Sequence, residues 1–231
     1  MTLDNKIALI TGAKGGLGNS VTHAFLNAGA TVIGVSRSIK ASDFPNSRFV
    51  AMPAQLSSAE AAQSVADAVI ARHQKIDVLV HLVGGFAGGQ PIAETSDATF
   101  DQMFDLNLRS AFHILRAVVP HMRRQRSGRI LAIGSRAAVE PGANAGAYNA
   151  SKAALVSLIR TVALENQDLS ITANVILPGT MDTPGNLAGD PKADFSKWVQ
   201  PDQVAAILVH WASDAASQIT GAVIPIYGPN L

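Results

Sequence analysis

Short apolar runs alternate with longer segments of helical periodicity along the chain. Seven of these runs have strand length and are almost continuously apolar, at residues 7–10, 31–35, 48–52, 78–83, 130–133, 171–177 and 222–227. Strands that are buried on both faces have this pattern, so it predicts a doubly wound α/β fold with a seven-stranded parallel sheet and helices on both faces. Pro225 lacks a backbone donor, which places the last strand at an edge of the sheet.

Apolar stripes at helical spacing occur between these runs. One stripe comprises Val204, Ile207, Leu208 and Trp211. A longer stripe predicts a helical core face at Phe100, Met103, Phe104, Leu108, Ala111, Phe112, Leu115, Val118, Val119 and Met122. Segments 84–91, 141–146 and 178–191 are rich in glycine and proline and are expected to be loops. Because ligands bind at the carboxyl ends of strands in such sheets, these loops should line one cleft.

Composition narrows the classes of partner. With 231 residues, the chain fits one domain, residues 1–231. A net charge of +1 without blocks of like charge predicts a small-molecule partner and neither nucleic acid nor membrane. The absence of cysteine excludes disulfides and thiolate metal sites, and no metal is expected. We find neither an apolar stretch of the ~18 residues that a membrane span needs nor a secretory signal, so we expect a cytoplasmic protein.

A glycine-rich segment directly follows the first apolar run. It reads TGAKGGLG and contains Gly12, Lys14, Gly16, Leu17 and Gly18 at the start of a helical segment. Glycine lets a backbone turn tightly and approach a pyrophosphate, whose charge is favoured at a helix N-terminus. The segment therefore predicts a nucleotide site. A tight turn without a ligand is the alternative.

Ser36 and Arg37 directly follow the second apolar run. At this place a site for NAD would carry an acidic residue for the ribose 2′-hydroxyl. A guanidinium can instead bind a 2′-phosphate with two charge-assisted hydrogen bonds. Arg37, with Lys14 and Ser36, thus favours NADP(H) over NAD(H). The alternative for Arg37 is a solvated surface side chain.

Tyr148 and Lys152 lie four residues apart and so share one face of a helix. A nearby cation lowers the pKa of a phenol, which makes this pair a candidate proton donor for carbonyl reduction. Ser135 lies just after the fifth apolar run and could stabilise charge on a substrate oxygen. The alternatives are a half-buried tyrosine beside an extended lysine, and a serine that caps a turn.

Asn107 lies in the middle of the long apolar stripe. A buried amide without partners would cost about 1–3 kcal/mol, so something must hold it. Asn107 is therefore a candidate site residue, with a structural amide bonded to nearby backbone as the alternative.

Together these features resemble one family. The motif TGAKGGLG, Asn107, Ser135, Tyr148 with Lys152, and Pro178-Gly179 with Thr183 have the order and approximate spacing of a one-domain short-chain dehydrogenase/reductase. The resemblance covers almost the whole chain. It implies a Rossmann fold, hydride transfer between NADP(H) and a small carbonyl or alcohol substrate, and a homo-oligomer, a dimer or tetramer with the helices of Asn107 and Tyr148 at the contact.

The resemblance also implies roles for the catalytic residues. Tyr148 would be the general acid/base, and Ser135 would polarise the carbonyl. Lys152 would hold the nicotinamide ribose and lower the pKa of Tyr148. Asn107 would anchor a water that passes protons from Lys152 to solvent.

Cofactor contacts are implied at the later loops. Gly84, Pro178 and Gly179 would adjoin the cofactor. Thr183 would bind its carboxamide side, with Thr180 as a helper. A substrate lid is expected at about 180–201.

The chain departs from the family pattern in places. Residues 81–84 read HLVG where the family usually has NNAG, and we interpret His81 as a core or strand-end histidine. Gln55 stands where relatives often carry an aspartate that faces the adenine, and it could still bind there. The segment GGFAGG at 84–89 resembles dihydropteridine reductases, so a pteridine is a second substrate class. A non-catalytic NADP-binding sensor or scaffold is the alternative from another class.

Overall fold

The computed structural model describes residues 2–229 and contains a seven-stranded parallel sheet. The strand order is β3-β2-β1-β4-β5-β6-β7. The strands are β1 Ile7–Thr11, β2 Thr31–Ser36, β3 Phe49–Pro53, β4 Val78–His81, β5 Gly128–Ile133, β6 Ile171–Pro178 and β7 Val223–Ile226. This confirms the predicted doubly wound sheet and the edge position of β7, which contains Pro225.

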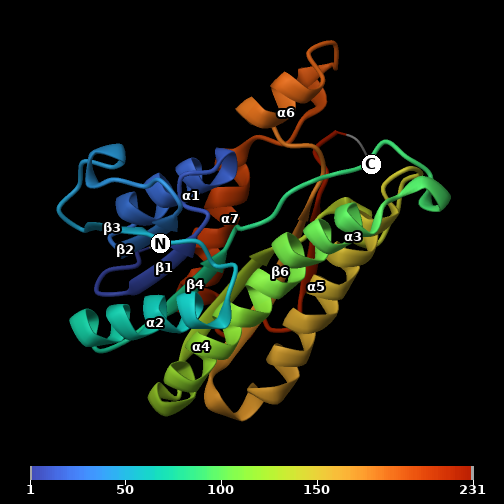
Figure 1. Cartoon of the computed structure of the whole chain (residues 1–231). Helices are drawn as coiled ribbons and strands as arrows, with labels where there is room; N and C mark the ends of the chain where they lie inside the picture. Colours follow the sequence, from blue (N-terminus) through green and yellow to red (C-terminus); the bar gives the residue numbers. More distant parts are fainter. Residues whose placement is uncertain (1, 230–231) are drawn as a thin grey trace.

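Helices cover both faces of the sheet (Figure 1). The helices are α1 Gly16–Asn27, α2 Ala59–His73, α3 Asp97–Phe104, α4 Ser110–Gln125, α5 Gly146–Glu165, α6 Pro184–Gly189 and α7 Pro201–Ala212. Alternate side chains of β1 point to opposite layers. Ile7 and Leu9 pack with α2, α4 and α5. Ala8 and Ile10 pack with α1 and α7.

The fourth strand ends earlier than its apolar run. The run predicts a strand to Val83, but β4 ends at His81. Thr11, the last residue of β1, pairs with His81, and β1 then turns away into the glycine loop. Leu82 keeps one hydrogen bond, to the Thr11 carbonyl at 3.0 Å. The prediction for Val83 is wrong because that residue has lost its neighbouring strand and lines a cavity instead.

The long apolar stripe is only partly a core face. Met103, Leu115 and Met122 are buried, but Phe100 and Phe112 are 44% and 45% exposed. A π-helical turn at Asp105–Arg109 joins α3 to α4. A turn with an i→i+5 bond shifts the phase of a helix by part of a turn. Beyond it, Leu115 and Met122 are still buried as the stripe predicts, but Phe112 at the margin of the stripe is exposed.

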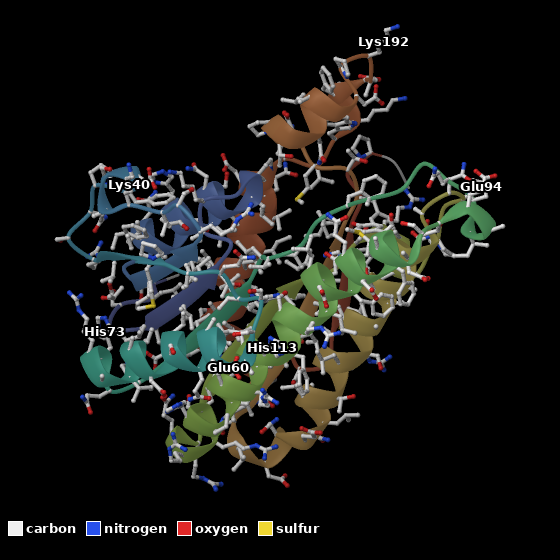
Figure 2. The ribbon with its side chains drawn as sticks, in the orientation of Figure 1. Lys40, Glu60, His73, Glu94, His113 and Lys192 are labelled. Carbon is white, nitrogen blue, oxygen red and sulfur yellow. The ribbon has the colours of Figure 1, made fainter. Side chains whose placement is uncertain are left out.

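The sheet reverses its order of extension between β1 and β4, which places a crevice at their carboxyl ends. Beyond the carboxyl ends of the strands, α6 stands away from the rest of the chain (Figure 1). Lys192, just after α6, marks the tip of this projection in Figure 2. No helix within residues 2–229 is both long enough and apolar enough to cross a lipid bilayer.

Candidate active site

Two adjoining cavities occupy the crevice, with volumes of about 890 and 660 Å³. They share Gly12, Gly15, Leu82 and Gly84. The first extends over the ends of β2 and β3 and is lined by Lys14, Ser36, Arg37 and Gln55, among others. The second includes Gly16, Leu17, Gly18, Ser135, Tyr148, Lys152, Pro178, Gly179, Thr180 and Thr183 in its lining. The structure thus brings together every predicted site residue except Asn107, which lies behind the cavity wall.

The glycine loop is shaped by steric demands. Gly12 has a φ of +76°, a conformation that L side chains rarely adopt. A β-carbon on Gly18 would collide with the Gly12 carbonyl oxygen. A β-carbon on Gly16 would lie 2.7 Å from the Thr183 β-carbon, so the loop after β6 lies directly against the start of α1.

The N-terminus of α1 suits an anion. Gly15 is its N-cap and offers no side-chain cap, and the first turn contains no acidic residue. The first N–H groups of a helix have no partner within it, and the helix dipole favours negative charge there. These features fit the pyrophosphate of a dinucleotide.

Cationic side chains lie at the end of β2. The Ser36 hydroxyl accepts a hydrogen bond from the Lys14 backbone N–H at 3.1 Å. Arg37 is exposed, and no hydrogen bond or ion pair joins it to another residue of the described chain. Lys14, in contrast, forms an ion pair with Asp43 at 2.9 Å. Sequence reasoning missed Asp43, because only the folding of the β2–β3 connection brings it to Lys14.

Ser135 and Tyr148 meet at the end of β5. Ser135 caps a short turn, Arg136–Ala138, by accepting a hydrogen bond from the Ala137 N–H at 3.2 Å. Burial raises the pKa of Tyr148, and a hydrogen bond from Ser135 lowers it by less. The pKa of Tyr148 is therefore above its usual value. Lys152 does not contribute to this shift, so its predicted lowering of the phenol pKa stays a prediction.

Lys152 is almost fully buried, and burial lowers its pKa to about 8. Its ammonium donates a hydrogen bond to the Ile133 carbonyl at 3.1 Å. A β-carbon on Gly84 would lie 3.1 Å from the Lys152 ammonium and 2.8 Å from the Asn107 amide oxygen. The glycine at position 84 thus lets the lysine and the asparagine approach the same stretch of backbone.

Asn107 is fully buried in the π-helical turn and has partners at both ends of its amide. Its oxygen accepts from the Gly85 N–H at 2.9 Å, and its nitrogen donates to the Gly85 carbonyl at 3.0 Å. The same nitrogen donates to the Ser151 hydroxyl at 3.0 Å, and Ser151 donates to the Tyr148 carbonyl at 2.8 Å. Asn107 therefore joins the loop after β4 to the helix of Tyr148, and its role in anchoring a water stays a prediction.

His81 is a buried structural histidine, as predicted. Its ring contacts the Thr11 hydroxyl at 2.8 Å and the Ser110 hydroxyl at 3.4 Å. Burial, with a smaller contribution from the charge of Lys152, lowers its pKa to about 3. The neutral ring thus connects the end of β1 to the start of α4, directly below the cleft.

The second cavity also includes residues that were not predicted as site residues, and three of them bear on the chemistry. Phe86 is 68% exposed and contacts the Tyr148 ring edge-on, with centroids 5.0 Å apart. Arg136 pairs with Glu140 at 2.6 Å, and both line the second cavity. Arg136 directly follows Ser135 in the chain, so its position beside a predicted site residue was a usable signal.

The geometry agrees with the comparisons to known proteins. The sequence profile of the family described as short chain dehydrogenase matches residues 6–192. The chain therefore belongs to the short-chain dehydrogenase/reductase family of oxidoreductases, whose members bind a nicotinamide cofactor and act on carbonyl or alcohol substrates.

Several relatives are similar over nearly their whole length. The 2-dehydro-3-deoxy-D-gluconate 5-dehydrogenase of Pseudoalteromonas atlantica is 31% identical, with 98% of this chain and 96% of that protein covered. The 3-oxoacyl-(acyl-carrier-protein) reductase of Thermotoga maritima is 29% identical, with 99% and 98% covered. Among solved structures, levodione reductase superposes with a TM-score of 0.90 at 25% identity, covering 97% of each chain.

Proposed function

We propose that this chain is an NADP(H)-dependent oxidoreductase that transfers a hydride between nicotinamide and a small carbonyl or alcohol substrate, with Tyr148 as general acid/base. One observation carries this proposal. Ser135, Tyr148 and Lys152 line the same cavity as the start of α1, so a candidate proton donor shares a cavity with a helix N-terminus that suits a pyrophosphate.

NADP(H) is favoured by the charges at the adenosine end. Arg37 and Lys14 line the first cavity, and no acidic residue lies among residues 36–38 to repel a 2′-phosphate. The exposed guanidinium of Arg37 is suited to bidentate phosphate binding. Gln55 lines the same cavity and would contact the adenine.

The residues of the second cavity can perform the acid–base part of the reaction. The bound nicotinamide supplies the hydride. Ser135 donates a hydrogen bond to the carbonyl oxygen and stabilises the negative charge that develops there. Tyr148 delivers its phenolic proton to that oxygen. Burial raises the pKa of Tyr148, and the positive charges of Lys152 and of a bound oxidised nicotinamide would lower it.

Lys152, Thr183 and Asn107 have supporting roles in this proposal. Lys152 binds the nicotinamide ribose, and Thr183, beside Gly16, binds the carboxamide side. Thr180 assists from the same cavity. Asn107 anchors a water that returns protons to Tyr148 through Lys152. The segment at about 180–201, which contains α6, serves as the substrate lid.

A quinonoid pterin is a second candidate substrate. Phe86 presents an exposed ring edge-on to Tyr148, and such a ring can pack against a planar heterocycle. The Arg136–Glu140 pair on the cavity wall offers polar groups to its exocyclic atoms. The presence of Ser135 keeps ordinary ketones and aldehydes as the first candidates.

NADPH oxidation against a panel of ketones, aldehydes, diketones and quinonoid pterins tests the proposal. We expect turnover of at least one carbonyl class, with NADPH preferred over NADH. Tight NADPH binding without turnover of any compound would favour the sensor or scaffold instead. Turnover of pterins alone would select the second candidate.

We also infer a homo-oligomer, a dimer or a tetramer, and a cytoplasmic location. Phe112 on α4 and Leu164 on α5 are exposed apolar residues on the helices expected at the contact. Light scattering coupled to size-exclusion chromatography measures the mass of the assembly. A monomer at micromolar concentration would contradict this inference.

A further inference from the structure

We propose that Asp43 is a specificity-determining residue that opposes the binding of a ribose 2′-phosphate by holding Lys14. The inference rests on the cofactor site proposed above. It predicts that the preference for NADP(H) over NAD(H) is smaller than it would be if both Arg37 and Lys14 were available to the 2′-phosphate.

The two cations differ in what holds them. Lys14 bonds both carboxylate oxygens of Asp43, at 2.9 and 3.0 Å, and the Ser38 carbonyl at 3.3 Å. Arg37 has no such partner among residues 2–229. A 2′-phosphate would therefore meet a guanidinium that is available and an ammonium that already neutralises a carboxylate.

Asp43 is positioned by its own turn and not by Lys14 alone. It ends the short turn Ala41–Asp43 in the connection from β2 to β3, next to Lys40, which is labelled in Figure 2. Its carboxylate accepts a hydrogen bond from the Lys40 N–H at 2.8 Å. Ile39 and Phe44, on either side of the turn, are 1% exposed. The Phe44 ring packs against Phe49 at 4.8 Å. The buried flanks keep the carboxylate beside Lys14.

An aspartate carries its charge at neutral pH. The hydrogen bonds from Lys14 and the Lys40 backbone lower the pKa of Asp43 further, so its carboxylate stays charged well into the acid range. A phosphate that binds Lys14 must displace this carboxylate or share the ammonium with it, and the two anions repel each other. The Lys14–Asp43 pair is partly exposed, with 40% and 23% of the side chains accessible. Exposed pairs are weak, so the opposition should amount to a few-fold change in affinity.

The Asp43→Asn variant tests this inference. Asparagine keeps an oxygen for the Lys40 N–H but removes the charge. Titration calorimetry with adenosine 2′,5′-bisphosphate and with adenosine 5′-monophosphate isolates the 2′-phosphate from the rest of the cofactor. We expect about twofold to fivefold tighter binding of the bisphosphate and an unchanged affinity for the monophosphate.

The Lys14→Met variant, alone and combined with Asp43→Asn, tests whether Asp43 acts through Lys14. If Asp43 acts through Lys14, most of the gain from Asp43→Asn disappears when it is combined with Lys14→Met. Asp43→Ser provides a second variant, with a hydroxyl for the turn and no charge. Circular dichroism checks that each variant folds.

Each result decides the inference. An unchanged bisphosphate affinity in Asp43→Asn would overturn it, and if the unaltered chain still preferred the bisphosphate, the proposed NADP(H) dependence would stand. Weaker monophosphate binding would also overturn it, by showing that Asp43 accepts a hydrogen bond from the ribose. Equal affinities of the unaltered chain for the bisphosphate and the monophosphate would contradict the proposed preference for NADP(H). A gain of bisphosphate affinity in Asp43→Asn would even then support the role of Asp43.

Discussion

The two ends of the cleft are built in different ways. At the proposed catalytic end, Lys152, Asn107 and His81 are buried, and other protein groups bind their polar atoms. At the adenosine end, Arg37 and the Lys14–Asp43 pair are exposed or partly exposed. Buried polar groups are held within narrow limits and cost stability when they lose a partner. Exposed charges can be exchanged at small cost. The catalytic end should therefore tolerate little change, while the adenosine end can be tuned.

The largest effect is expected from Tyr148→Phe. This variant removes only the phenolic oxygen, so kcat should fall about 10³-fold or more while NADPH still binds. Tyr227→Phe is the matched control, because Tyr227 is the other tyrosine of the chain and packs under Arg136. It should keep kcat within about threefold. Equal losses in both variants would contradict a special role for Tyr148.

Lys152→Met should separate activity from stability. We expect kcat to fall about 10²-fold or more, because the cation that tunes the phenol is lost. The variant should nevertheless be more stable at pH 7 by about 1–2 kcal/mol, since it removes a buried charge at the cost of one hydrogen bond. Urea unfolding measures this free energy.

The pH dependence of that difference follows from the pKa of Lys152. The folded pKa is about 8, below the usual value of 10.5. Between these values the unfolded chain binds more protons than the folded chain, so the stability of the unaltered protein rises with pH. The advantage of Lys152→Met should thus be greatest below pH 8 and shrink toward pH 10.5. A difference that is constant over this range would contradict the lowered pKa.

At the adenosine end, Arg37→Ala should weaken NADPH binding about 10- to 100-fold and change NADH binding by less than about twofold. Salt should weaken NADPH binding to the unaltered chain more than to the variant, since exposed charges are screened. Fluorescence titration with each cofactor measures both effects. Equal losses for NADPH and NADH would assign Arg37 to some part of the site other than the 2′-phosphate.

The smallest effect on catalysis is expected from His81→Gln, whose consequences concern stability alone. The folded pKa of about 3 lies below the usual 6.5, so unfolding takes up a proton between these values and stability falls as the pH is lowered. The variant should reduce the slope of unfolding free energy against pH by about 1.4 kcal/mol per unit in this window. An unchanged slope would mean that the ring is not kept neutral by burial.

Much of the fold could be predicted because strands buried on both faces carry continuous apolar runs. The site residues could be predicted because the family motif fixes their order, and Asn107 because an amide interrupts an apolar stripe. The end of β4, the exposure of Phe112 and the partner of Lys14 could not. These depend on where β1 leaves the sheet, on the phase shift of a π-helical turn, and on a connection that brings Asp43 back over twenty-nine positions.

The direct test of the account is a structure of the chain with bound NADP⁺. We predict that the nicotinamide ring lies in the cavity of Ser135, Tyr148 and Lys152, with the Tyr148 hydroxyl and the reactive ring carbon both facing the substrate space. A nicotinamide ring bound outside this cavity, or a Tyr148 hydroxyl turned away from it, would contradict the assignment.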